Sequence, residues 1–598
     1  MHRPDTRRAP PEGEDLRGVE GVQPTTPRSR LGAALDRVRG IGDGGQGLIA
    51  LLAYVLFSVL IWGVPVVTNL SEVYVGKGAR DPQLYLWSLA WWPHALLNGQ
   101  NPILTDALWV PDGVNLAWVT AIPGPAMAMA PVTRTLGPVA SLNILMLLAP
   151  ALSAWGAFLV CRRVTRSFWP SLAGGYVFGF STYQLGQMWG HLNLGLTFPI
   201  PLVVYLVLRR HQGDLKAWWF VPLLAVVLAA QFSISTEVFA TMTMFGAIAL
   251  AGAAAFVAGR RRTLATIGWV AAAYATAALL VSPLLVYAFR DVPLEPLRQA
   301  AKPSEDLLSF VLPRFSMLIG GKRFEMFTER FTLNWTGDGG YLGPALLLML
   351  VLFAATRWRH RSTWLLLGFA AVAAVLSMGP VLHIAGRETI PMPWRLMEGV
   401  PLIHHALPQR FVLYMWLPVA VMAALWLNGR RLAWARWPLV AVAAVMLLPD
   451  LSSPYMHGMV RVPAFFSEGT YRRYIRPGET VMTIPLGHGE LDGADMHWQA
   501  ITDMYFRLAD GHVGFVPEQF RGRAENALRL DRPGGVNREI LADFIARHRV
   551  SVVVITEPFF DRWKRVLAEL GVDPVRAGGV VLYRLPRPGE AGPPPRGG

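Results

Sequence analysis

Cysteine is almost absent from this chain of 598 residues, in which Cys161 stands alone. A single cysteine excludes an intramolecular disulfide and any metal site built from cysteine ligands. Cys161 lies beside a basic turn, and we expect it to be a packing residue.

Charged residues are also scarce, at 16% of the chain against 53% hydrophobic residues, with a mean hydropathy of +0.36. This composition excludes an ordinary soluble multidomain protein, and the length excludes a single soluble core. The net charge of +15 comes from arginines that are spread over turns and termini rather than gathered on one face, so we expect no nucleic-acid partner.

The apolar residues form eleven runs, several of them short or interrupted by proline, and about 20 apolar residues are needed to cross a bilayer. The predicted fold is an α-helical polytopic membrane protein with spans at 47–68, 138–160, 168–187, 191–208, 217–234, 237–258, 265–288, 341–356, 363–383, 410–427 and 436–449.

Five of these runs are followed by short basic turns, at 162–166, 209–211, 260–262, 357–361 and 430–431. Because Lys and Arg in short loops stay in the cytoplasm, the turns predict a cytoplasmic N-terminus. An odd number of spans then places the C-terminus outside the cytoplasm, in a protein of the inner (plasma) membrane.

The chain divides into four predicted regions. Residues 1–46 have the composition of a disordered basic tail. The apolar stretch 47–68 lies farther from the terminus, and is longer, than the apolar region of a signal peptide, so it is predicted to stay as the first helix. Residues 47–449 form the membrane domain. Residues 450–585 are predicted to be an extracytoplasmic α/β domain, with strands at 481–484, 550–555 and 580–583 and helices at 535–548 and 559–570. Residues 586–598 are a second disordered tail.

The long outer segments, at 69–137, 289–340 and 384–409, are where we expect function. The Trp-rich stretch 84–92 is typical of a helix that lies in the headgroup layer. Asp81 precedes it and is followed by Pro82, so Asp81 is either an N-cap or a catalytic base, and the two roles are compatible.

The arrangement of a first helix, a long outer loop that opens with an Asp, a helical bundle and an outer C-terminal domain resembles the GT-C superfamily of membrane glycosyltransferases. The segments at 81–87, 304–310, 339–343 and 406–411 also resemble bacterial members of that superfamily.

This resemblance implies that a sugar moves, with inversion, from a polyprenyl-phosphate donor to an acceptor in the cell envelope. A carboxylate in the first outer loop would take the acceptor proton, and Asp81 occupies that position. Glu72 is the nearby substitute, although its place at the helix exit favours a simple interfacial acid.

Two further polar residues interrupt the apolar pattern at the predicted outer boundary. Glu237 lies between two apolar runs with almost no connection, and an ionisable residue at such depth usually faces a cavity and has a partner. We interpret it as a second catalytic candidate, with a structural ion pair as the alternative. His191 occupies the equivalent boundary one hairpin earlier and is a secondary candidate, or a merely solvated side chain.

The donor phosphate requires cations, and Arg binds phosphate with two parallel hydrogen bonds. Arg410 is the first candidate, with snorkelling to the interface as its alternative role, and Arg387 and Arg395 are the alternates. His404 and His405 are secondary candidates in the same loop, and Arg314, Lys322 and Arg323 offer cations in another.

We expect no cofactor and no metal. Asp81 has no adjacent second acid, and His404 and His405 are not spaced to share a helix face. Phosphate-loop, dinucleotide and Gly-x-Ser-x-Gly motifs are missing where a strand and a helix would confirm them. His488, Asp492, Asp495, His497 and Trp498 are interpreted as a solvated loop, with a role in acceptor recognition as the alternative.

Two other functions fit a polytopic chain. A transporter or lipid flippase would also need many spans and broken helices. Such proteins are commonly built from inverted internal repeats, and we find none in this sequence. A scaffold for envelope assembly is the third possibility.

The topology gives a first prediction. A reporter that works only outside the cytoplasm should be active when it is fused after residue 460, because the charge pattern places 450–598 outside. Protection of this region from protease in cells stripped of their outer barriers would contradict the prediction.

Overall fold

The structure is a computed structural model that describes residues 42–77, 81–256, 259–291, 303–332, 338–397, 406–429, 433–484, 486, 494–514, 516–517, 520–522, 524, 528 and 533–586. The described residues from Gly47 onward belong to one compact unit. The predicted tails at 1–46 and 586–598 lie almost wholly outside the described residues.

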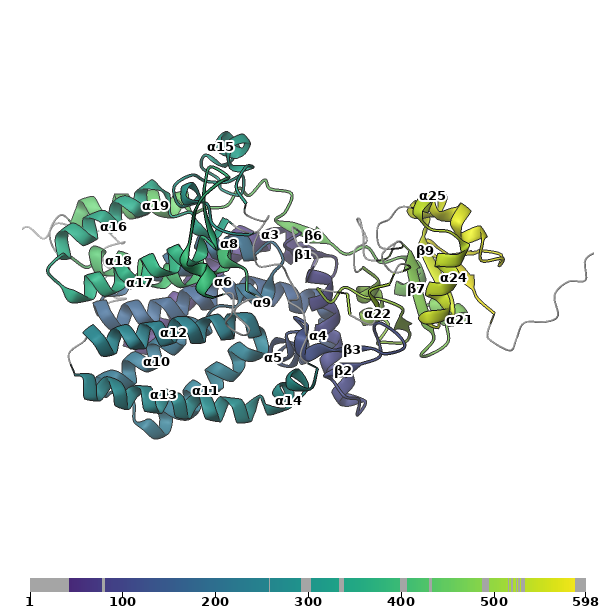
Figure 1. Ribbon diagram of the computed structural model, residues 1–598, viewed down its shortest axis with the longest axis horizontal. Coiled ribbons are helices and arrows are strands. Elements are labelled where there is room, and N and C mark those ends of the chain that lie inside the picture. The colour runs from purple at the N-terminus through teal and green to yellow at the C-terminus, as the bar shows by residue number, and fades with distance from the viewer. Residues whose placement is uncertain are drawn as a thin grey trace, which may run out of the picture. The chain divides into compact units, whose positions relative to one another are not determined.

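The membrane part consists of helices (Figure 1). Among the described residues, seven are long and apolar enough to cross a membrane: Asp43–Thr68 (α2, η1 and α3), Ala130–Thr165 (α6), Leu192–Gln212 (α9 and α10), Ala217–Ile234 (α11), Thr236–Phe256 (α12), Arg260–Leu280 (α13) and Pro408–Leu427 (η7 and α18). Shorter apolar helices are Gly343–Arg357 (α16), Arg361–Ser377 (α17) and Ala433–Met446 (α19). The predicted fold class is confirmed.

All eleven predicted runs contain helix, but three are broken. The run at 191–208 divides into α9 (Leu192–Gly195) and α10 (Pro199–Gln212), and the last residues of the run at 363–383 belong to a strand, Val381–Ile384. The run at 168–187 forms α7 (Phe168–Gly179) and α8 (Thr182–Gln187), because Ser181 accepts a hydrogen bond from the Gln184 amide and starts a new helix. In the run at 265–288, α13 ends at Leu280 and a second helix, α14 (Ser282–Arg290), follows. The length of an apolar run therefore does not tell whether the run forms one continuous helix or two helices.

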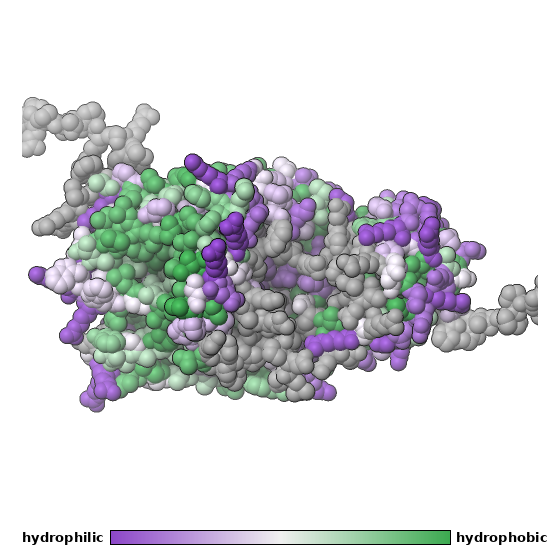
Figure 2. Space-filling model, turned by 45° about the horizontal axis from the view of Figure 1, so that its top comes forward, coloured by the Kyte–Doolittle hydropathy of each residue, from purple (hydrophilic) through white to green (hydrophobic). Residues whose placement is uncertain are grey.

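The surface of the bundle is suited to lipid. Along α2 (Asp43–Ser58) and the adjoining η1 (Val59–Gly63), Leu48, Leu52, Leu56 and Leu60 are 57–60% exposed. Figure 2 shows hydrophobic residues gathered over the bundle and hydrophilic ones over the C-terminal elements. The chain is therefore an integral membrane protein.

Three of the basic turns lie side by side at one end of the bundle. Arg163 pairs with Asp214, which follows the next basic turn, and a Cβ added to Gly213 would meet the guanidinium of Arg262 in the third turn. Asn428, at the C-terminal end of α18, donates a hydrogen bond to the Thr165 carbonyl. Charges that share one end agree with a common side of the membrane, although the side itself remains a prediction.

At the other end, short elements cover the bundle. They are β1 (Val73–Val75), α4 (Asp81–Leu97), β2 (Leu104–Thr105), β3 (Val114–Asn115), η2 (Leu116–Trp118), α5 (Pro123–Ala128), η3 (Leu307–Phe310), α15 (Gly321–Thr328), η4 (Asp338–Gly340), β4 (Val381–Ile384), β5 (Arg387–Pro391) and η5 (Pro393–Leu396). β1 pairs in antiparallel register with β6 (His457–Met459), which follows the last membrane helix.

The C-terminal elements form a five-stranded mixed sheet in the order β10-β11-β9-β7-β8. The strands are β7 (Thr480–Ile484), β8 (Arg507–Leu508), β9 (Val552–Thr556), β10 (Val575–Ala577) and β11 (Val580–Arg584), and the helices are α20 (Ala464–Ser467), α21 (Tyr471–Tyr474), α22 (Ala494–Ile501), η10 (Pro533–Gly535), α24 (Arg538–Arg547) and α25 (Glu557–Ala568). β7 is parallel to β8 and β9, whereas β11 is antiparallel to β9. The predicted strands and helices of this region are present, and they bury a separate core that includes Val553, Trp563 and Val581.

The Trp-rich helix α4 does not expose its indoles to a headgroup layer, as the sequence had suggested. Trp87, Trp91 and Trp92 are 0%, 3% and 4% exposed. Trp87 Nε1 donates to Gln499 Oε1 of α22 at 2.6 Å, and Trp92 Nε1 donates to the Ala121 carbonyl at 2.8 Å. The helix is instead an internal layer between the bundle and the C-terminal elements.

Gln499 provides the second prediction. Its amide accepts from Trp87 and donates to the Ala107 and Phe506 carbonyls, at 2.9 and 2.7 Å, in a fully buried site. Gln499→Ala leaves these groups unpaired, so we expect a loss of roughly 1–3 kcal/mol of stability. Thermal unfolding in detergent measures the loss, and the exposed Gln100→Ala should have little effect. Equal melting of the two variants would contradict the prediction.

Candidate active site

Asp81 is the first residue of α4, and its carboxylate lies between two imidazoles. Oδ2 is 3.8 Å from Nε2 of His191, and Oδ1 is 3.4 Å from Nε2 of His512. His191 precedes α9, whereas His512 follows β8 in the C-terminal region. Three segments that are distant in sequence therefore meet at the Asp81 carboxylate. The side chain of Asp81 is 19% exposed, so solvent still reaches it.

Tyr85 lies one helical turn beyond Asp81 on α4. Its hydroxyl is 2.6 Å from Asn193 Oδ1 and 3.5 Å from Asp81 Oδ2. A hydroxyl has a single proton, and the shorter contact takes it. Tyr85 therefore fastens the start of α4 to α9 directly beside the Asp81 carboxylate.

Glu237 and Arg410 form an ion pair. Glu237 begins the first turn of α12, and Arg410 lies in η7 (Pro408–Val412). Their side chains are 24% and 11% exposed. The sequence allowed two roles for Glu237, a catalytic residue or a member of a structural ion pair. The structure shows the ion pair, and the catalytic role remains a prediction.

The ion pair is close to the Asp81 cluster. Asp81, Tyr183 and Glu237 all interact electrostatically with the Arg410 guanidinium. His191, Glu237 and Arg410 lie just before α9, in the first turn of α12 and in η7, at the helix ends that are opposite to the basic turns. The structure thus brings together four of the residues singled out in the sequence: Asp81, His191, Glu237 and Arg410.

Other candidates lie elsewhere. Glu72 is exposed and lines a cavity whose lining does not include Asp81. Arg387 is exposed on β5. Arg395 lies in η5, but its side chain is outside the described residues, as are His404 and His405.

The acids in the second long outer segment are used structurally. Asp306 accepts hydrogen bonds from the amides of Ala385 and Gly386, at 3.1 and 2.7 Å, and so fixes the β4–β5 turn. Among the alternate cations in this segment, Lys322 pairs with Asp450 at 3.2 Å.

The interpretation of residues 494–498 as a solvated loop is wrong. Asp495, His497 and Trp498 belong to α22 and are 7%, 3% and 2% exposed. His488 and Asp492 lie outside the described residues. The sequence analysis also missed His512, Tyr85 and Asn193, and no spacing in the sequence connects His512 to Asp81.

In the part of the chain that the structure describes, no group of three or more His, Cys, Asp or Glu residues is placed to hold a metal ion. Independence of metals remains a prediction.

The chain matches a known protein family. A family model described as a domain of unknown function (DUF6311) matches residues 50–452, more than half of the sequence. The protein belongs to the DUF6311 family. The match begins in α2 and ends just before β6, so the family region contains Asp81, His191, Glu237 and Arg410 but not His512. No curated protein matches the chain.

Among solved structures, the arabinofuranosyltransferase AftD from Mycobacteria is similar over 90% of this chain and 40% of its own, at 15% identity and a TM-score of 0.53. The chain thus spans about two fifths of AftD. The Archaeoglobus fulgidus oligosaccharyltransferase (12% identity, 86% and 70% covered, TM-score 0.48) and Cupriavidus metallidurans ArnT bound to undecaprenyl phosphate (10% identity, 89% and 97% covered, TM-score 0.46) are more distant in structure. The similarity to AftD shows a shared GT-C fold.

Proposed function

We propose that this protein is a membrane glycosyltransferase that moves a sugar from a polyprenyl-phosphate donor to a hydroxyl of a cell-envelope acceptor, with inversion. One observation carries the proposal: the Asp81 carboxylate lies between His191 and His512 and interacts electrostatically with Arg410, whose side chain is only 11% exposed. A base and a largely buried cation at the predicted outer end are the two groups that such a transfer needs. The fold shared with an arabinofuranosyltransferase supports this choice.

In the proposed step, the acceptor oxygen attacks the anomeric carbon while Asp81 takes its proton. The new bond between the acceptor oxygen and the anomeric carbon forms as the bond from that carbon to the phosphate oxygen breaks. The polyprenyl phosphate leaves with the electron pair from the opposite face, so the anomeric configuration inverts. Inverting glycosidases use the same base chemistry on water.

The two histidines act on Asp81 rather than on the substrate. His512 Nε2 is within hydrogen-bond distance of Asp81 Oδ1, at 3.4 Å, and a proton on that nitrogen would hold the carboxylate in one orientation. His191 Nε2 lies 3.8 Å from the other oxygen, which is too far for a hydrogen bond, but the ring would limit the rotation of the carboxylate from that side. We assign both as positioning residues.

Arg410 is the proposed partner of the donor phosphate. Its guanidinium has five N–H donors, and the contact with Glu237 engages Nη1. The remaining donors can bind phosphate oxygens in parallel. Glu237 then compensates the buried cation when no donor is present, and Arg387 and Arg395 stay as alternates.

Asp81→Asn tests the base. Asn caps a helix about as well as Asp but has almost no basicity, so a protein that needs only a cap should be unaffected. If Asp81 is the base, transfer from a defined polyprenyl-phosphate sugar should fall by roughly 10² or more. The rate of sugar transfer by the purified protein in nanodiscs measures this.

A matched control accompanies that variant. Asp106→Asn changes an exposed acid of the same outer loop that pairs with Arg507, and it should transfer sugar at the normal rate. Near-normal transfer by a folded Asp81→Asn protein would eliminate Asp81 and direct attention to Glu72 or Glu237.

Arg410→Ala and Glu237→Gln form a second matched pair, because each breaks the same ion pair. Only the first removes the cation, so only Arg410→Ala should weaken donor binding, by roughly tenfold or more, with little change in acceptor binding. Titration with a polyprenyl-phosphate sugar measures both affinities. Equal donor affinity in the two folded variants would remove Arg410 from the donor site.

A further inference from the structure

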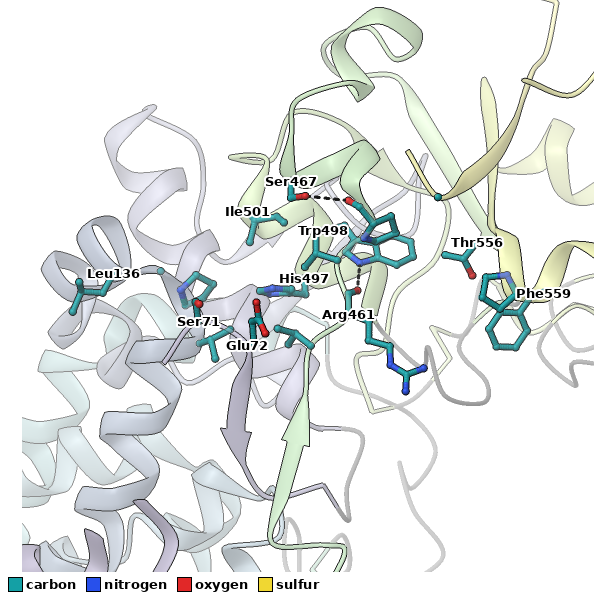
Figure 3. Close-up of a pocket in the computed structure, with 18 residues that line it drawn as sticks. Ser71, Glu72, Leu136, Arg461, Ser467, His497, Trp498, Ile501, Thr556 and Phe559 are labelled. Atoms are coloured by element: carbon teal, nitrogen blue, oxygen red, sulfur yellow. Dashed lines mark hydrogen bonds between the residues drawn. The ribbon is translucent and has the colours of Figure 1, made fainter. Parts of the chain in front are cut away.

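A cavity with a volume of about 760 Å³ is shown in Figure 3, and Asp81 is not among the residues that line it. Its walls come from the turn at 71–72 after the first membrane helix, the kink at 136–139 in α6, the segment 460–467, α22 and the start of α25. Sites for small molecules usually enclose about 300–1,000 Å³. The cavity is therefore large enough to hold a ligand, and it is too large to be a packing defect.

Two buried polar atoms of the cavity wall lack a hydrogen-bond partner among the described residues: Nδ1 of His497 and Oγ1 of Thr556. The two residues are only 3% and 7% exposed. Thr556 is the N-cap residue of α25, yet its side chain makes no capping bond. Each unpaired group costs roughly 1–3 kcal/mol, so a ligand that supplies partners here would gain affinity.

The charges of the lining favour a neutral ligand. Glu72 and Arg461 stand on the cavity wall with opposite signs, and Ser71 and Ser467 add hydroxyls. Burial lowers the pKa of His497 to about 4, so its imidazole is neutral near pH 7 and offers one donor and one acceptor. A phosphate or another strong anion would face Glu72 as well as Arg461.

The rest of the lining is apolar and includes aromatic rings. Phe559 and Trp498 line the cavity, and the Trp498 indole is held in place by a 3.0 Å bond from Nε1 to the Arg461 carbonyl and by stacking on Phe466. Sugar rings present C–H faces together with a rim of hydroxyls. Fixed aromatic rings beside hydroxyls, an imidazole and opposite charges match both parts of such a ligand.

We propose that this cavity binds a neutral oligosaccharide and holds the acceptor glycan at a distance from Asp81. The identity of the glycan as acceptor rests on the proposed transferase function, whereas carbohydrate binding by the cavity does not. The same helix, α22, contributes His497 and Trp498 to the cavity and bonds through Gln499 to α4, which begins at Asp81.

Binding can be tested on the full-length protein in nanodiscs with an array of neutral oligosaccharides that includes arabinans, galactans, mannans and glucans. Ser467 is exposed on the rim, so Ser467→Trp should fill the cavity without removing core packing. We expect it to weaken binding of the preferred oligosaccharide by roughly tenfold or more. Glu468→Trp, a change at the next exposed position outside the lining, should bind as the unaltered protein does.

A second pair avoids bulky substitutions. Arg461→Gln removes a polar group of the wall, and Arg473→Gln removes an exposed arginine of α21 outside the lining. Only the first should reduce binding. If no oligosaccharide binds, or if the Ser467→Trp and Arg461→Gln proteins bind as well as their controls, the proposal is wrong.

The two proposals fail separately. Asp81→Asn should abolish transfer and leave oligosaccharide binding unchanged. If it instead transfers normally while Ser467→Trp loses binding, the cavity stands as a carbohydrate site and the assignment of the base falls. If Asp81→Asn stops transfer but the cavity variants bind normally, the base stands and the cavity proposal falls.

Discussion

The hydrogen bond from Trp87 to Gln499 connects helix α4 to the C-terminal region, and the candidate site depends on it. Both side chains are fully buried, and Gln499 also holds the Ala107 and Phe506 carbonyls. A buried amide with unpaired partners is costly, so this arrangement specifies one relative position of α4 and α22. That position brings His512 to Asp81 across 431 residues of sequence.

The second constraint is the cost of burying charge. An ionisable group at membrane depth needs a partner or a polar cavity, and Glu237 and Arg410 provide one for each other. Their pairing leaves a cation close to Asp81 without an isolated buried charge. Because the basic turns occupy the opposite helix ends, the positive-inside rule and the location of the candidate chemistry agree with one orientation of the bundle.

The sequence was informative where a polar residue interrupts an apolar pattern. Asp81 was singled out because it opens the first long outer segment, and His191, Glu237 and Arg410 because each lies at the boundary of an apolar run; the structure brings all four together. Three of the five described strands of the C-terminal sheet were also predictable, since β-branched runs at 481–484, 550–555 and 580–583 are strong local signals. These successes rest on patterns that a few neighbouring residues define.

The errors arose where distant contacts decide the outcome. Trp-rich α4 has the composition of an interfacial helix, but α22 covers it. His497 and Trp498 were interpreted as a solvated loop because the chain around them is polar, yet they belong to α22 and are buried. His512 gave no signal at all, since its partner lies in another part of the chain. Local composition cannot report which surface a later segment will cover.

Helix α22 links the two proposed sites through residues that are adjacent in sequence. His497 and Trp498 line the cavity, Gln499 holds α4, and the Met496 sulfur accepts a hydrogen bond from the His512 amide at 3.1 Å. Helix α22 therefore connects the wall of the cavity both to His512, an imidazole neighbour of Asp81, and to α4, which begins at Asp81 itself. One short helix thus helps to fix the position of the cavity relative to the Asp81 carboxylate.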